Sequence, residues 1–190
     1  MEKADAGASA APYSAAAQLF HWLTFLLVAI QVPIGIVMAD RGHHNIFDAL
    51  TNNLYSTHKL IGFTLLWIVI LRLGYRLSFG TPRPEPSLPP WQVAVSRANH
   101  WALYALLLIM PMLGWLGVSM FPATNIYGLF DLPSIASKSD LAKPVLAIHR
   151  TLAWVLIALV ALHVLAATYH FIVRKDGVLQ RMLPARAKRP

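Results

Sequence analysis

Four apolar stretches, each about as long as a membrane is thick, constrain the fold of this chain more than any other feature. They cover approximately residues 19–39, 55–77, 100–121 and 144–173. A helix needs about 20 apolar residues to cross the hydrocarbon core of a bilayer. The sequence therefore predicts an all-α integral membrane protein, a bundle of four transmembrane helices in contact with membrane lipid.

The composition of the chain also indicates a membrane protein. Of its 190 residues, 57% are apolar and 13% are charged, whereas a soluble domain has about 25% charged residues. The formal charge of +8 lies at the helix ends, where it indicates topology and argues against a nucleic acid partner. A single domain accounts for this length. We expect an N-terminal segment at 1–17, the four-helix domain at 18–175 and a basic tail at 176–190.

The positive charges are distributed unevenly among the segments that connect the helices. Arginine and lysine gather between the second and third stretches and in the C-terminal tail, whereas the other two loops are nearly balanced. Cytoplasmic loops of membrane proteins are enriched in these residues, so we expect both termini in the cytoplasm. The proline-rich residues 81–90 lie in the same cytoplasmic segment and predict a stiff linker that is not helical.

Four histidines lie in the apolar stretches at depths that sort them into two pairs. His149 and His163 are 14 residues apart in one stretch, so they fall on nearly the same helix face, ~21 Å apart along the axis. With the expected topology, His58 lies near the outer side together with His149. His21 lies near the inner side together with His163.

Each pair comes from two different helices, as an iron between two axial imidazoles requires. The chain has no cysteine, which excludes thiolate ligation and covalent attachment of haem through cysteine. Ionisable groups inside membranes are functional candidates by default, so the spacing predicts two bis-histidine haems. The alternatives are interfacial histidines or a bare metal site, but the stretches contain no Asp or Glu, which transition-metal transport would favour.

Four further residues near the expected inner side each allow two interpretations. His100 and His170 are candidates for binding or protonating a quinone headgroup, or else they are plain interfacial residues. Arg72 and Arg76 lie one turn apart and anchor a helix end. They are also candidates for pairing with haem propionates through charge-assisted hydrogen bonds.

Two cations, Lys59 and Arg150, directly follow the predicted outer ligands. The structural interpretation is that both side chains extend to the membrane surface. The functional interpretation is a basic funnel that attracts a small anion or stabilises haem propionates.

Short motifs along the chain resemble the bacterial cytochrome b561 family in order and spacing. The resemblance covers about Tyr13 to Pro184. The motifs are Gln18-Leu19-Phe20-His21-Trp22-Leu23, Thr57-His58-Lys59-Leu60-Ile61-Gly62, Leu71-Arg72-Leu73 with Arg76, Asn99-His100-Trp101-Ala102-Leu103-Tyr104, Ile148-His149-Arg150-Thr151-Leu152-Ala153, Leu162-His163, and His170 to Lys175-Asp176-Gly177.

The resemblance implies a small four-helix protein of the bacterial inner membrane that encloses two haems b. Its axial ligands would be His21, His58, His149 and His163. It implies an oxidoreductase that takes electrons from superoxide at the periplasmic face and delivers them to ubiquinone through the inner haem. On this basis Lys59 and Arg150 are candidate guides for superoxide, and the quinone would lie near His100 and His170.

Two other functions compete with this interpretation. Related dihaem proteins are membrane cytochrome b subunits that pass electrons between a periplasmic dehydrogenase or hydrogenase partner and quinone. The short, nearly neutral outer loops offer little surface to such a periplasmic redox protein, which favours the stand-alone enzyme. The third possibility is a haem-free scaffold or metal transporter, which would be colourless when purified.

Overall fold

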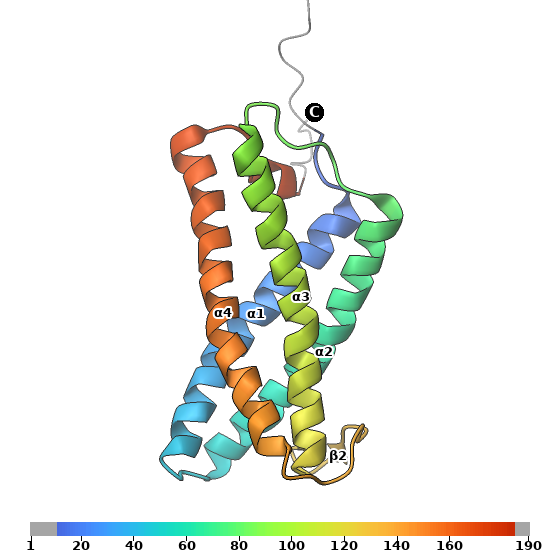
Figure 1. Cartoon of the computed structure of the whole chain (residues 1–190), viewed down its shortest axis with the longest axis vertical. Coiled ribbons are helices and arrows are strands. Elements are labelled where there is room, and N and C mark those ends of the chain that lie inside the picture. Colours follow the sequence, from blue (N-terminus) through green and yellow to red (C-terminus); the bar gives the residue numbers. More distant parts are fainter. Residues whose placement is uncertain (1–10, 185–190) are drawn as a thin grey trace, which may run out of the picture.

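The chain forms a bundle of four long helices (Figure 1), as seen in a computed structural model that describes residues 11–184. The helices are α1 (Ala15–His43), α2 (Ala49–Phe79), α3 (Pro90–Met120) and α4 (Ala142–Tyr169). All four are long and apolar enough to cross a membrane. The predicted fold class is confirmed: the chain is an all-α, multi-pass membrane protein.

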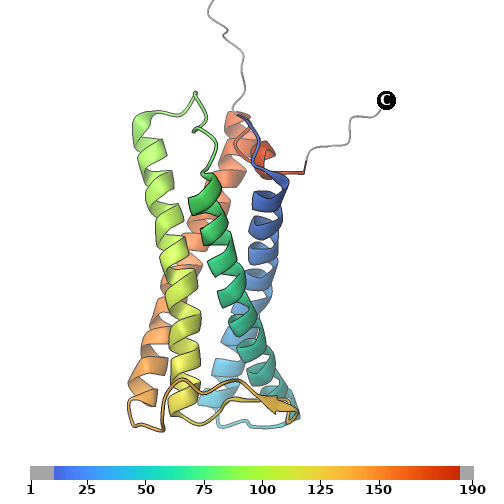
Figure 2. The same ribbon diagram turned by 90° about the vertical axis from the view of Figure 1, so that its right-hand side faces the viewer.

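The two ends of the bundle differ in what they carry (Figure 2). Residues 11–14, the loop at 80–89 and the C-terminal residues 175–184 lie at one end, here called the terminal end. The loops at 44–48 and 121–141 lie at the other end, here called the loop end. Neighbours in sequence run antiparallel, with α1 packed on α2, α2 on α3 and α3 on α4.

Short elements complete both ends. Strands β1 (Asn125–Ile126) and β2 (Phe130–Asp131) form a small antiparallel hairpin at the loop end. A π-helical turn, η1 (His170–Arg174), continues α4, and a 3-10 turn, η2 (Gln180–Met182), follows it at the terminal end.

Polar side chains cap the N-termini of the first two helices. The Ser14 hydroxyl accepts a hydrogen bond from the backbone N–H of Ala17 (3.3 Å) and caps α1. The carboxylate of Asp48 caps α2 by accepting from the backbone N–H of Thr51 (2.9 Å), and it pairs with Arg41 (2.6 Å). These contacts, led by the Thr51 N–H, lower the pKa of Asp48 to about 2. The cap therefore stays ionised far below neutral pH.

The prediction of a non-helical linker through residue 90 is wrong at its end. Pro90 is the first residue of α3, a position where proline is favoured because the N–H that it lacks would be unpaired anyway. As a result His100 lies well inside α3 and not at its start.

Segments outside the helices pack against the bundle at the terminal end. The Trp22 indole N–H donates to the carbonyl of Met182 (2.7 Å). The Arg181 guanidinium donates to the carbonyls of Ala11 (3.0 Å) and Arg83 (2.8 Å). The described parts of the two predicted terminal segments therefore pack against the helix bundle. Residues 1–10 and 185–190, which include Arg186, Lys188 and Arg189, lie outside the described residues.

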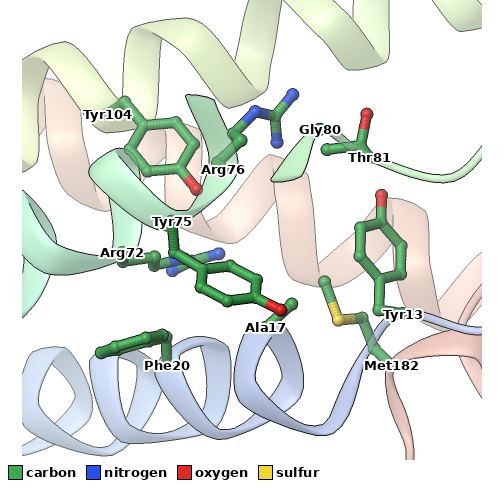
Figure 3. Close-up of a pocket in the computed structure, with 10 residues that line it drawn as sticks. All are labelled: Tyr13, Ala17, Phe20, Arg72, Tyr75, Arg76, Gly80, Thr81, Tyr104 and Met182. Carbon is green, nitrogen blue, oxygen red and sulfur yellow. The ribbon is translucent and has the colours of Figure 1, made fainter. Parts of the chain in front are cut away.

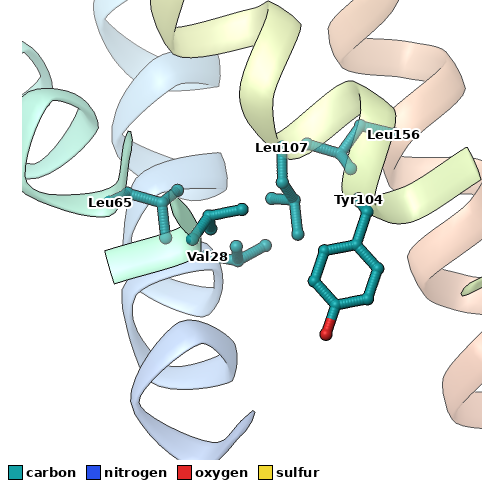
Figure 4. Close-up of a cluster of buried hydrophobic side chains, with 6 residues drawn as sticks. Val28, Leu65, Tyr104, Leu107 and Leu156 are labelled. Carbon is teal, nitrogen blue, oxygen red and sulfur yellow. The ribbon is translucent and has the colours of Figure 1, made fainter. Parts of the chain in front are cut away.

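An apolar cluster at mid-height joins all four helices (Figure 4). Its buried members are Val28, Leu65, Val69, Tyr104, Leu107 and Leu156. Because lipid tails are as apolar as these side chains, close packing and not removal from water holds membrane helices together. This cluster is therefore a packed spacer between the two halves of the bundle.

Gly117 of α3 packs closely against Leu146 of α4. A Cβ atom added there would lie 2.5 Å from Cδ2 and 2.7 Å from Cγ of Leu146. A side chain at position 117 would force Leu146 or the helix backbone to shift.

We expect Gly117→Ala to lower the free energy of unfolding by about 1–3 kcal/mol, because overpacking forces side chains and backbone to shift. Unfolding in detergent, followed by circular dichroism, measures this change. Gly74→Ala is the matched control, since a Cβ there meets nothing within 4 Å among the described residues. Equal free energies of unfolding for the two variants would show that the close contact between Gly117 and Leu146 does not determine stability.

Candidate functional site

Interior positions seven residues apart on each helix build three layers across the bundle. The middle layer contains Val28, Leu65, Leu107 and Leu156 of the apolar cluster. The layer nearer the loop end contains Gly35, His58, Gly114 and His149, and the layer nearer the terminal end contains His21, Arg72, His100 and His163. Seven residues are about two helical turns, or ~10 Å along an axis. The bundle therefore carries a histidine layer on each side of an apolar one.

In the layer near the loop end, the rings of His58 on α2 and His149 on α4 face each other. Their ring centres are 6.2 Å apart and their planes are nearly perpendicular, at 82°. Imidazole nitrogen binds a transition metal at about 2 Å and the ring centre lies about 1 Å behind it, so one metal ion separates two ring centres by about 6 Å. The spacing of the two rings fits an ion bound between them.

Two glycines make room for these two rings. A Cβ added to Gly35 of α1 would lie 3.0 Å from Cε1 and 3.4 Å from Nδ1 of His58. A Cβ added to Gly114 of α3 would lie 3.2 Å from Cε1 and 3.4 Å from Nδ1 of His149. In both cases the Nδ1 edge of the ring faces the neighbouring helix. Nε2 of His58 has no such close contact with Gly35, and Nε2 of His149 is the farthest of the three ring atoms near Gly114, at 4.0 Å.

The two histidines near the loop end differ in their hydrogen bonds. Nδ1 of His149 lies 2.8 Å from the carbonyl oxygen of Met110. A carbonyl only accepts, so Nδ1 carries the proton and Nε2 keeps the lone pair that a metal needs. Nδ1 of His58 is buried and has no partner among the described residues.

In the layer near the terminal end, His21 of α1 and His163 of α4 form a second facing pair. Their ring centres are 6.0 Å apart, with an angle of 55° between the planes. His100 of α3 lies even closer to His163, with 5.2 Å between ring centres. Three histidines therefore meet where the sequence predicts two, and His163 is the common neighbour of the other two.

A cavity surrounds this second pair. It is lined by all four helices, including His21, His100, His163 and Arg72 among mainly apolar side chains. Cofactor sites are typically apolar with a few precisely placed polar groups. The lining of the cavity fits a flat apolar cofactor with an acidic edge.

Arg72 connects this cavity to a smaller pocket at the terminal end (Figure 3). The polar lining of that pocket includes Arg72, Arg76, Tyr13, Tyr75 and Tyr104. The Arg72 guanidinium lies 3.0 Å from Nδ1 of His21 and 5.3 Å from the centre of the Tyr104 ring. Arg76 lies 5.5 Å from the Trp101 ring centre. Two guanidinium groups in so confined a place suit carboxylate groups.

The candidate quinone residues His100 and His170 lie in different environments. His100 lines the histidine-bearing cavity, whereas His170 opens the π-helical turn after α4. Nδ1 of His170 is 2.5 Å from a carboxylate oxygen of Asp176, which is only 7% exposed and also lies 3.6 Å from Arg174. His170 is thus held by a carboxylate for which the sequence pattern predicts no role.

The two candidate cations near the loop end also differ. The Lys59 ammonium donates to the backbone carbonyls of Ala123 (2.9 Å) and Asn125. It therefore holds the β1–β2 segment against α2, next to His58. Arg150 is exposed, so its charge faces the surroundings directly.

Several residues of these sites are not predicted by the sequence pattern. Gly35 and Gly114 carry no recognisable signal, although the seven-residue spacing from Val28 and Leu107 places them in the histidine layer. Gln31 stands out as a polar residue in the first apolar stretch, but the sequence does not indicate which residue it contacts. It contacts the backbone of His58.

Together, the fold and these sites define a class: a membrane protein whose helices hold facing histidines at two depths, suited to a bound metal cofactor. Comparison with known proteins gives the family. The model of the prokaryotic cytochrome b561 family matches residues 12–185. The chain belongs to the prokaryotic cytochrome b561 family.

Three relatives have similar lengths. Cytochrome b561 homolog 2 of Escherichia coli (strain K12) is 30% identical over 173 residues, which cover 90% of each chain. Cytochrome b561 homolog 1 of the same strain is 29% identical over 87% of this chain and 93% of its own length. The probable superoxide oxidase CybB of Yersinia pestis is 29% identical over 86% of this chain and 91% of its own length.

Family membership gives a coarse function to the fold. The protein is a membrane cytochrome that binds b-type haem and transfers electrons, an oxidoreductase-type activity. The facing rings, the glycines beside them and the orphaned Nδ1 of His58 are features of this chain that fit haem.

We expect Gly35→Ala and Gly114→Ala each to weaken haem binding by about tenfold, because the neighbouring ring must shift by a few tenths of an ångström to make room for the added Cβ. Haem content of the purified protein, from the pyridine haemochrome spectrum, measures the loss. Gly74→Ala again serves as the control, since its Cβ meets no described atom within 4 Å. Full haem content in both glycine variants would contradict this account of the pocket.

Proposed function

We propose that this protein carries two haems b and acts as a superoxide:ubiquinone oxidoreductase of the bacterial inner membrane, with both termini in the cytoplasm. The observation that carries the proposal is the presence of two facing histidine pairs at two depths, with ring centres 6.2 Å and 6.0 Å apart. Two sites in one bundle support electron transfer from one membrane face to the other.

In this proposal four histidines hold the two cofactors. His58 and His149 would hold the haem near the outer, loop end, and His21 and His163 would hold the haem near the inner, terminal end. The bound haems supply one-electron redox chemistry, whose potentials depend on ligands, hydrogen bonds and burial. The apolar layer of Val28, Leu65, Leu107 and Leu156 keeps water away from the region between the two sites.

Arg72 and Arg76 neutralise carboxylates at the inner site. Both guanidinium groups line the pocket next to the histidine-bearing cavity. Burying a carboxylate without a partner is costly, and a planar guanidinium pairs with it through two hydrogen bonds. Haem propionates directed toward this pocket would meet both arginines.

The quinone is reduced on the inner side, near His100 and His170. The His170 and Asp176 side chains form a partly buried pair at the terminal end, where protons enter from the cytoplasm. Two superoxide anions give up one electron each and leave as oxygen, and one quinone takes up the two electrons and two protons. The imidazoles of His100 and His170 orient the headgroup and hold the protons at its oxygens.

The proposed oxidation of superoxide is supported by the positive charge near the loop end and by the name of one relative. Arg150 is exposed beside His149, and the relative from Yersinia pestis bears the name probable superoxide oxidase. A fixed positive charge raises the local concentration of an anion and its association rate. Lys59 adds charge there while its ammonium holds the loop.

The visible spectrum of the purified, oxidised protein tests the proposed activity. With catalase present, a pulse of superoxide is expected to produce the reduced b-type spectrum within the mixing time, and ubiquinone is expected to restore the oxidised one. The control is dithionite, which reduces the haems whatever the donor. Reduction by dithionite without any reduction by superoxide would eliminate superoxide as the donor.

One observation favours a second candidate, a cytochrome b subunit that takes electrons from a periplasmic dehydrogenase or hydrogenase. The β1–β2 hairpin at the loop end presents Leu129, which is 80% exposed, and Phe130, which is 49% exposed. An apolar tip at that end suits contact with another protein. Co-purification of a stoichiometric periplasmic partner, combined with no response to superoxide, would favour this candidate.

We expect Arg150→Gln to slow superoxide-driven haem reduction by up to about tenfold at low ionic strength, because one steering charge is lost. The rate is measured by stopped flow over a range of salt concentrations, and its salt dependence should become flatter. Lys143→Gln is the control, since Lys143 is also an exposed cation of α4 but lies farther along the chain from the ligand. An unchanged rate and salt dependence would exclude Arg150 as a guide.

A further inference from the structure

Gln31 is a polar residue in the apolar first helix, and its side chain faces α2. Its amide nitrogen donates a hydrogen bond to the backbone carbonyl of His58 (2.9 Å). Its amide oxygen, Oε1, is buried and has no partner among the described residues. Inside a membrane no water replaces a missing partner, and an unpaired polar atom costs several kcal/mol. This oxygen is therefore available to accept a hydrogen bond from a neighbouring group.

The His58 ring also has a polar atom that is unpaired in the described structure. Its Nδ1 is buried and also has no partner in the described part of the chain. The Nδ1 edge faces α1, since a Cβ on Gly35 would lie 3.4 Å from this nitrogen. Gly35 is one helical turn from Gln31, on the same face of α1. The orphaned acceptor and the orphaned ring nitrogen thus belong to neighbouring positions on the same helix contact.

His149, which faces His58, has the Nδ1 hydrogen bond that His58 lacks among the described residues. Nδ1 of His149 has a carbonyl acceptor, Met110, at 2.8 Å. Histidines that bind a metal almost always donate their other ring N–H to an oxygen, which fixes the tautomer and makes the ligand more basic. Within residues 11–184 no backbone oxygen serves His58 in this way, and Gln31 is a side chain already hydrogen-bonded to the same residue.

Space for the amide is built into α2. A Cβ on Gly62 would lie 3.1 Å from the amide nitrogen of Gln31. A larger residue at position 62 would push the amide away from His58. Gly62 and Gly35 therefore give the Gln31 amide and the His58 ring room to lie between α1 and α2.

We propose that Gln31 is the positioning residue of His58: its Oε1 accepts a hydrogen bond from the Nδ1–H group, leaving Nε2 to bind the outer haem. A rotation of the terminal amide brings Oε1 toward the ring while the side chain stays between α1 and α2. This inference rests on the proposed outer haem site, and it adds a residue that tunes only one of the two haems.

The test uses the full-length holoprotein and three variants. Gln31→Met keeps the length of the side chain but removes the acceptor, and Gln31→Glu keeps an acceptor and strengthens it. Gln92→Met is the matched control, because Gln92 also has a buried Oε1 without a described partner but lies on α3 at the terminal end. For each protein, haem transfer to apomyoglobin gives the affinity, and an optical redox titration gives the two midpoint potentials.

We expect Gln31→Met to weaken outer haem binding by about 10–100-fold, the usual effect of losing such a hydrogen bond, and to raise the outer midpoint potential. Gln31→Glu should retain the haem and lower that potential, because a carboxylate makes the ligand more basic. The inner haem, and both haems of Gln92→Met, should be unchanged. Normal haem affinity and potentials in both Gln31 variants would overturn the proposal, as would equal shifts of both haems.

His58→Ala separates this proposal from the proposed function. Loss of one haem from His58→Ala together with unchanged Gln31 variants would reject the role of Gln31 and leave the outer site intact. Retention of both haems by His58→Ala would reject the outer site itself, and the role of Gln31 with it. If Gln31→Met does not fold, the outer midpoint potential of Gln31→Glu tests the proposal: a lower potential supports the role of Gln31, and an unchanged or higher one rejects it.

Discussion

The structure depends on the register of its four helices, in which interior positions recur every seven residues. Each helix passes through three layers, and its residues in those layers lie about two turns apart. Left-handed bundles keep such a seam facing inward. The register places Leu156 between His149 and His163 on α4, and Leu65 between His58 and Arg72 on α2. A one-residue slip in any helix would turn a histidine or an arginine toward lipid, where it is costly.

Much of this arrangement can be predicted from the sequence, for identifiable reasons. Length and hydropathy determine the four helices, and the distance between His149 and His163 along one helix determines two depths. That argument leads to the same pairs that the structure brings face to face; their role as haem ligands stays a prediction. The sequence does not predict the approach of His100 to His163. The proline-rich residues 81–90 suggest that the third helix starts near His100, whereas α3 starts at Pro90 and His100 lies well inside it.

The remaining features depend on three-dimensional contacts that spacing does not reveal. Gly35 and Gly114 matter through the rings beside them, and glycine is common in transmembrane helices whether or not a ligand lies nearby. Lys59 reads as a free cation in the sequence, yet its ammonium is bound by loop carbonyls from a segment far along the chain. Asp176 likewise acquires its partner, His170, only through the turn that ends α4.

The pairing of helices has a consequence for how the molecule is assembled. α1 packs on α2 and α3 on α4, so the chain consists of two helical hairpins. Each facing histidine pair joins one hairpin to the other: His58 to His149, and His21 to His163. A metal bound between such rings would act as a crosslink, and binding to the folded state alone stabilises that state. A cofactor held by each pair would therefore join the two hairpins at two levels of the bundle.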